Sequence, residues 1–164
     1  MFENQQFYIY SITKVFIAIL VLQAAESQRI RLDEPITHYL DLSGLSQEVT
    51  VRRLLDHSSG LVCYTGLSDY QEAVKKSPSR PVSDEILLDW VMSSAPMFKP
   101  GSHFSYSNSG YFLLRLLLEK VTGLTLSEQL QNNICVPLGL RNTFEANRLN
   151  IESVTFGYAN RFSK

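Results

Sequence analysis

The sequence predicts a mostly helical fold class. Long stretches place apolar residues at helical spacing, and residues that commonly begin or end helices flank them. Only two short segments, residues 7–10 and 154–158, have the composition of strands. The chain has 164 residues and is 45% hydrophobic, which is enough for one domain with its own core. We therefore expect a single, predominantly α-helical domain over residues 1–164.

The first predicted helix covers residues 11–28. It contains the run VFIAILVLQAA, in which ten of eleven residues are apolar, so it is apolar on nearly every side. A helix of this kind packs in the middle of a fold. With Lys14 before it, the run also resembles the core of a secretory signal peptide, although it is shorter than the roughly 20 residues that span a bilayer. We expect a buried soluble helix; cleavage near Ser27 and a membrane anchor are the alternatives.

The sequence in the middle of the chain predicts two helices. Thr50 can cap a short helix, which the polar stretch at residues 58–81 interrupts. Ser83 can cap the next one, DEILLDWVMSSA, whose two early acidic residues suit the helix dipole and which Pro96 ends.

Two further helices are predicted after the Pro-Gly turn at residues 100–101. The first, GYFLLRLLLEKVTG, is strongly apolar and stops at Gly123, a typical C-terminal cap. Thr125 and Glu128 form a capping box for the second helix, which ends before Pro137.

Charge and cysteine content exclude several kinds of partner. The 15 Lys and Arg residues nearly balance the 16 Asp and Glu residues, and no basic stripe suited to nucleic acid is present. Cys63 and Cys135 lie far apart and neither belongs to a C-x-x-C pair, so we expect two buried free thiols. The sequence thus predicts no nucleic-acid partner, no metal site and no cofactor.

Ser11 and Lys14 form an S-x-x-K motif at the start of the first helix. Residues three apart lie on the same helix face, so the amine would lie beside the hydroxyl. An amine held against apolar surroundings can be neutral enough to take the serine proton. The helix start also adds positive potential where an oxyanion would form. Taken alone the motif is weak, because many helices begin with a Ser cap and carry Lys in the first turns.

The sequence YSN supplies a second pair of candidates, Tyr106 and Asn108. Alternate residues of an extended backbone face the same way, so both side chains can point into one cleft. A phenol near a lysine can transfer protons, and an amide can hold a substrate carbonyl or orient the lysine. The alternative is structural: Tyr106 would be a half-buried aromatic residue, and Asn108 or Ser109 would cap the following helix.

The sequence resembles the penicillin-recognising serine hydrolases, which include class C β-lactamases, D-alanyl-D-alanine carboxypeptidases and related esterases. Five stretches carry the resemblance in order along nearly the whole chain: SITKVF, RIRLDEPITHYL, VTVRRLLDHSSGL, FKPGSHFSYSNSGYFLL and EKVTGLTLSEQLQNNICVPLGLRNT. The resemblance implies the helical part of an α+β β-lactamase/transpeptidase-like fold, with most of the antiparallel sheet missing.

The resemblance also implies roles for individual residues. Ser11 would be the acylated nucleophile and Lys14 its activating partner. Tyr106 would carry a proton to the leaving group, and Asn108 would orient Lys14 and the substrate amide. His57, in LLDHSSGL, matches a structural stretch that shapes the wall under the site, so it is not nominated as a base.

The chain departs from the family pattern at its third motif. The family places a Lys-Thr-Gly or His-x-Gly triplet on a strand well downstream of the tyrosine, and this sequence contains none. The similar KVTG at residues 120–123 has an extra residue and ends a predicted helix. Only ten residues precede Ser11. We therefore expect a partial domain, truncated at both ends, in which one oxyanion donor would be missing, a loss of about 10² to 10³ in rate.

Two functions follow from these observations. The first is a serine hydrolase that forms an acyl-enzyme with a small-molecule substrate, namely a β-lactam, a D-alanyl peptide or a small ester. The second is a non-catalytic fragment or pseudoenzyme that binds a ligand or partner. Helix faces left without a sheet would be exposed, which predicts self-association. The compartment stays open between cytoplasmic, periplasmic and secreted.

Overall fold

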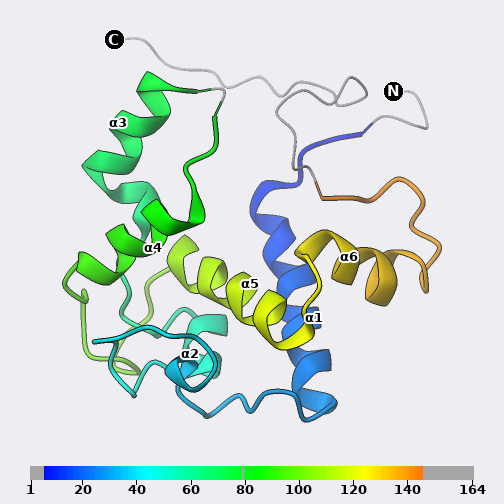
Figure 1. Cartoon of the computed structure of the whole chain (residues 1–164), viewed down its shortest axis with the longest axis horizontal. Helices are drawn as coiled ribbons and strands as arrows, with labels where there is room; N and C mark the ends of the chain where they lie inside the picture. The colour runs from blue at the N-terminus through cyan, green and yellow to red at the C-terminus, as the bar shows by residue number, and fades with distance from the viewer. Residues whose placement is uncertain (1–5, 79, 146–164) are drawn as a thin grey trace.

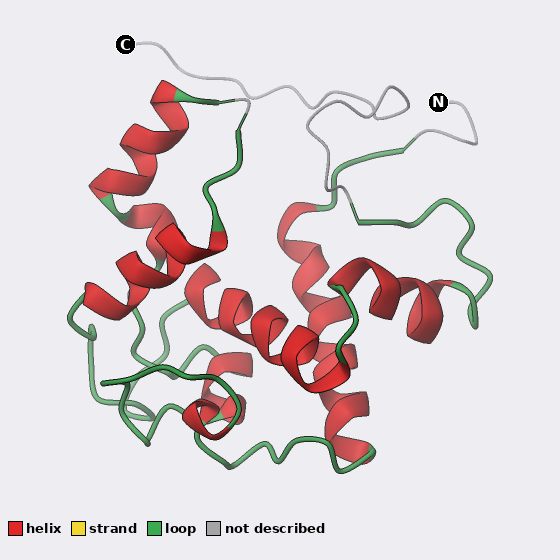
Figure 2. Cartoon of the chain, viewed as in Figure 1, coloured by secondary structure: helices red, strands yellow, loops and turns green. Residues whose placement is uncertain are grey.

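The computed structural model describes residues 6–78 and 80–145. Figure 2 shows helices and loops, and no strand, in this part of the chain. The predicted mostly helical fold class is confirmed. The extended backbone of Pro35 pairs with that of Thr50 at an isolated bridge.

Six α-helices are assigned in the described part of the chain (Figure 1). Short 3₁₀ turns at Tyr10–Ile12, Ile36–His38 and Tyr64–Gly66 join them, and α6 runs on into a π-helical turn at Gln131–Cys135. The helices are α1 (Thr13–Glu26), α2 (Val51–Leu55), α3 (Ser68–Lys76), α4 (Asp84–Ser93), α5 (Asn108–Thr122) and α6 (Leu126–Leu130).

Helices α1 and α5 pack against each other at the centre of the molecule (Figure 1). Each contributes a stripe of fully or nearly fully buried residues to one shared core: Ile17, Leu20, Val21 and Ala24 from α1, and Leu113, Leu114, Leu117 and Leu118 from α5. Helix α2 lies against α5 at Gly110, where a Cβ atom would come within 3.1 Å of the Leu54 carbonyl oxygen. The small residue therefore lets the two backbones approach closely.

One face of α1 differs from the prediction of an entirely buried helix. Val15, Ile19 and Leu22 are exposed, with 57% of Val15 accessible. The sequence is apolar on all sides, but the described residues, which include α5 and α6, cover only part of the helix surface. No helix in the described part of the chain is long and apolar enough to span a membrane.

The predicted helix caps on α2, α5 and α6 are confirmed. The Thr50 hydroxyl accepts from the Arg53 amide, and Thr125 and Glu128 form the reciprocal capping box. Gly123 ends α5 with φ +70°, a left-handed conformation that glycine adopts without strain. Ser83 occupies the N-cap of α4, but its side chain makes no cap hydrogen bond.

One secondary-structure prediction is wrong, and one helix was not predicted. Residues 7–10 do not form a strand: Tyr10 begins a 3₁₀ turn and has φ +44°. The polar stretch at residues 58–81 contains α3, which packs Tyr70 against Tyr64 with 5.2 Å between the ring centroids. The other predicted strand, residues 154–158, lies outside the described residues.

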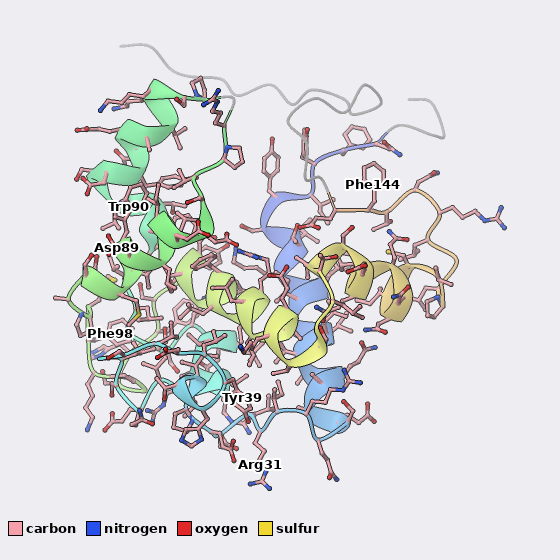
Figure 3. The ribbon with its side chains drawn as sticks, viewed as in Figure 1. Arg31, Tyr39, Asp89, Trp90, Phe98 and Phe144 are labelled. Carbon is pink, nitrogen blue, oxygen red and sulfur yellow. The ribbon has the colours of Figure 1, made fainter. Side chains whose placement is uncertain are left out.

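The loop between α1 and α2 is held by polar contacts around Tyr39, which Figure 3 shows near Arg31. The Tyr39 hydroxyl donates to Glu34 at 2.7 Å and accepts from the Arg31 amide at 2.8 Å. Hydrogen bonding with Tyr39 is the main cause that lowers the pKa of the Glu34 carboxyl. These contacts hold the loop in place at the end of α1 far from Ser11.

Candidate active site

Ser11 and Lys14 lie where the chain enters α1. Ser11 is the middle residue of the 3₁₀ turn Tyr10–Ile12, and Lys14 is the second residue of α1. Helical spacing brings the side chains together, as predicted, and Lys14 Nζ lies 3.4 Å from Ser11 Oγ. Ser11 is exposed, so its hydroxyl is accessible from solvent.

Tyr106 and Asn108, which lie more than 90 positions later in the sequence, approach the same point. Tyr106 lies in the extended segment before α5, and Asn108 is the first residue of that helix. The Tyr106 hydroxyl donates to Ser11 Oγ at 2.7 Å, and Lys14 Nζ donates to Asn108 Oδ1 at 2.7 Å. The structure therefore joins all four predicted site residues in one hydrogen-bonded chain.

The surroundings of Lys14 differ from the apolar environment that the sequence predicted. Besides the amide oxygen of Asn108, the ammonium faces two phenol rings, with Nζ 5.0 Å from the centroid of Tyr106 and 5.5 Å from that of Tyr111. Ring faces and amide oxygens attract a cation. Lys14 is thus placed to act on Tyr106 through its charge.

The pKa of Tyr106 lies below that of an ordinary phenol. Burial acts to raise this pKa, but hydrogen bonding to Lys14 and Ser11 and the charge of Lys14 outweigh burial. The side chain is 45% exposed, so solvent screens part of the effect. The phenol that touches Ser11 therefore loses its proton more readily than a free tyrosine.

His57 forms part of the wall beneath the site, the position that the family resemblance implied for it. Its ring is 4.6 Å from that of Tyr106 and 5.2 Å from that of Tyr111, and Nδ1 accepts the Ser107 amide at 3.2 Å. Burial is the main cause that lowers the His57 pKa, and the Lys14 charge adds to it. A neutral ring with Nδ1 as acceptor fits a role in holding the Tyr106 segment.

Sequence reasoning missed two residues that touch the site, Cys63 and Thr65. The Asn108 side-chain nitrogen donates to Thr65 Oγ1 at 3.2 Å and lies 3.5 Å from Cys63 Sγ. Cys63 is half-buried rather than buried, whereas Cys135 is buried as predicted, and both are free thiols. No local sequence signal marks these contacts, because they depend on how the loop before α3 folds onto α5.

A cavity of about 250 Å³ opens beside the site, between α1, α4 and α5. Lys14, Asn108 and Tyr111 line one part of it, and Asp84 and Arg115, which form an ion pair at 2.6 Å, line another. This cavity can hold a small substrate group next to Lys14. A larger cavity of about 450 Å³ lies at the C-terminal end of α1, lined by residues such as Arg29 and Asn132, and includes none of the four site residues.

Two further observations concern the KVTG sequence and possible metal ligands. The KVTG sequence forms the end of α5 and its Gly123 cap, as expected for a segment without a catalytic role. Among residues 6–78 and 80–145, no group of three or more His, Cys, Asp or Glu side chains could hold a metal ion.

Comparisons with known proteins match this arrangement. Residues 1–150 match the family described as Beta-lactamase. Penicillin-binding protein 4* of Bacillus subtilis is 30% identical over 162 residues, which cover 94% of this chain and 35% of that protein. A D-aminopeptidase of Brucella anthropi is 32% identical over 133 residues, which cover 81% of this chain and 25% of the relative.

Solved structures show the same fold. The crystal structure of a D-stereospecific amidohydrolase from Streptomyces sp. superposes with a TM-score of 0.77 at 31% identity, covering 84% of this chain and 44% of that one. Together with the curated relatives, it shows that the chain spans between a quarter and just under half of the proteins it matches.

Proposed function

The chain belongs to the beta-lactamase family, and we propose that it carries the acylation machinery of a serine hydrolase, with Ser11 as the nucleophile. One observation supports this most directly: Ser11 Oγ lies 2.7 Å from the hydroxyl of Tyr106, whose pKa is lowered, while Asn108 holds Lys14 beside both. A serine needs such a neighbour to remove its proton before it can attack.

The proposed reaction proceeds in two steps. The Tyr106 phenolate takes the Ser11 proton as Oγ bonds to the carbonyl carbon of a lactam, amide or ester. The carbon–nitrogen or carbon–oxygen bond then breaks, and its nitrogen or oxygen takes the proton from Tyr106. An amine or alcohol then departs, whereas a lactam nitrogen stays attached to the acyl group. Water next attacks the acyl-serine ester, which releases the acid and returns a proton to Ser11 Oγ. No redox change or cofactor is needed.

Lys14 and the helix start stabilise the charges that this reaction creates. The Lys14 ammonium favours the phenolate form of Tyr106, because opposite charges attract at short range. Ser11 lies in the first turn of a helical segment, where the backbone N–H groups of a helix start give positive potential that suits a developing oxyanion. Together these groups assist both the proton transfer and the attack.

The substrate class that we propose is a small molecule with a D-configured acyl residue or a β-lactam ring. Two of the relatives are named for D-stereospecific amide hydrolysis and one for penicillin binding. The cavity of about 250 Å³ next to Lys14 and Asn108 is large enough for a side chain of such a substrate. A D-alanyl peptide, a small ester and a β-lactam are therefore the compounds to test.

The test is covalent labelling followed by intact mass measurement. A penicillin is expected to add its whole mass and a fluorophosphonate its mass less HF, and Ser11→Ala is expected to abolish both gains. Ser68→Ala is a matched control, because Ser68 is also an exposed serine at a helix start. Labelling that survives Ser11→Ala would refute the proposed nucleophile.

A second candidate function is a non-catalytic chain that binds a ligand or partner. The exposed apolar face of α1, formed by Val15, Ile19 and Leu22, favours this candidate because such faces commonly mark contact surfaces. Absence of any mass gain over hours with both reagents would support it over the hydrolase.

A further inference from the structure

The side-chain amide of Asn108 is held on both sides. Its oxygen accepts from Lys14 Nζ at 2.7 Å, and its nitrogen faces Thr65 Oγ1 at 3.2 Å and Cys63 Sγ at 3.5 Å. The Asn108 backbone amide also donates to Cys63 Sγ, at 3.3 Å. Three contacts thus hold the side chain of Asn108, and a fourth holds its backbone.

These partners determine which way the amide points. If the amide were rotated by half a turn, its nitrogen would face the Lys14 ammonium, and two donors would oppose each other. Its oxygen would then face Cys63 Sγ, which already accepts the backbone amide. Lys14, which can only donate, therefore selects this orientation, and Thr65 and Cys63 supply acceptors that match it.

The loop that carries Cys63 and Thr65 is itself attached to the start of α5. Ser109 Oγ donates to the Val62 carbonyl at 2.6 Å and accepts from the Tyr64 amide at 3.0 Å, and Ser109 is fully buried. Cys63 Sγ lies 3.1 Å from Thr65 Oγ1, so the thiol and the hydroxyl also contact each other. The loop and Asn108 therefore form one rigid unit.

The sulfur is electronically suited to this role. Burial raises the pKa of the Cys63 thiol, but hydrogen bonding with Thr65 and Asn108 outweighs burial, and the net pKa lies below the usual value. A sulfur atom with more thiolate character is a stronger acceptor for the two Asn108 donors.

We propose that Cys63 and Thr65 are positioning residues that hold Asn108 with its oxygen toward Lys14 and thereby keep Lys14 beside Ser11. This inference rests on the proposed function for its catalytic consequence.

The first test observes Asn108 directly by NMR and does not need catalysis. We expect the side-chain and backbone amide signals of Asn108 to shift as Cys63 ionises, and Cys63→Ala to remove this titration step. Cys135→Ser is the matched control, because Cys135 is the second free thiol and has no described contact with Asn108. Cys63→Ser keeps an acceptor and serves if Cys63→Ala unfolds, which the melting temperature reports. Asn108 signals that titrate identically with and without the Cys63 thiol would overturn the proposal.

The second test measures labelling of Ser11 by a fluorophosphonate. Thr65→Val keeps the side-chain shape but removes the acceptor, and the loss of one hydrogen bond should slow labelling about threefold to tenfold. Thr65→Ser should restore the rate to within about twofold, since it returns the hydroxyl. Equal rates in all three proteins would contradict the positioning role. If the parent chain does not label at all, the proposed function fails, while the NMR test still decides whether the Cys63 thiol contacts Asn108.

Discussion

Replacing Tyr106 with phenylalanine removes one hydroxyl and leaves the ring against His57, 4.6 Å away. The deleted group donates a hydrogen bond of 2.7 Å to Ser11 Oγ. If Tyr106 transfers protons, its loss should slow acylation by about 10² to 10⁴. If the hydroxyl only makes a hydrogen bond in the resting site, the loss should be about twofold to twelvefold. The two roles therefore predict rates that do not overlap.

The assay is the rate of acyl-enzyme formation, followed by intact mass, with two reagents that differ in leaving group. The ring nitrogen of a penicillin needs a proton when its bond to the carbonyl carbon breaks, whereas the p-nitrophenolate expelled from a p-nitrophenyl ester does not. We expect Tyr106→Phe to slow the penicillin reaction by at least about 10² and the ester reaction by less. Tyr70→Phe is the control, because Tyr70 also packs against another aromatic ring but has no described contact with Ser11. A loss below about tenfold with penicillin would refute proton transfer by Tyr106.

Two further predictions concern charge and backbone shape. Hydrogen bonding with Lys14 and the Lys14 charge lower the pKa of Tyr106, so the acylation rate should rise with pH and level off below the pKa of an ordinary phenol. Lys14→Met should move this rise to higher pH. An unchanged pH profile in an active Lys14→Met variant would contradict the coupling between Lys14 and Tyr106. Gly60→Ala should cost at least about 2 kcal/mol more in urea unfolding than Gly123→Ala, because both glycines have positive φ but only at Gly60 would a Cβ overlap the Phe98 carbonyl. Equal losses in the two variants would show that the backbone shifts to accommodate the clash.

The sequence predicted the features that depend on neighbouring residues. The capping box of Thr125 and Glu128 and the stop at Gly123 need only three or four consecutive positions, and the structure shows both. Ser11 and Lys14 meet for the same reason, since helical spacing alone brings them together. Local signals thus place helix ends and half of the site.

Features that depend on tertiary packing were not predictable in the same way. Helix α3 carries few apolar residues, and its segment reads as polar because only Tyr70, Ala73 and Val74 interrupt a run of charged and polar residues. The apolar composition of α1 does not reveal which side the other helices cover. The contacts of Cys63 and Thr65 join a loop to a helix more than 40 positions away, and no spacing rule reaches that far.

The bond between Lys14 and Asn108 spans 94 positions of the chain. Contacts of such separation close only after the intervening polypeptide has collapsed, because joining distant segments costs loop entropy before it returns any stabilisation. In a partly folded chain, Lys14 and Asn108 are therefore not in place to activate Ser11. A reagent that reacts with the activated Ser11 hydroxyl would therefore label only correctly folded chains during refolding. The labelled fraction, measured against time, would report the rate at which α1 packs onto α5.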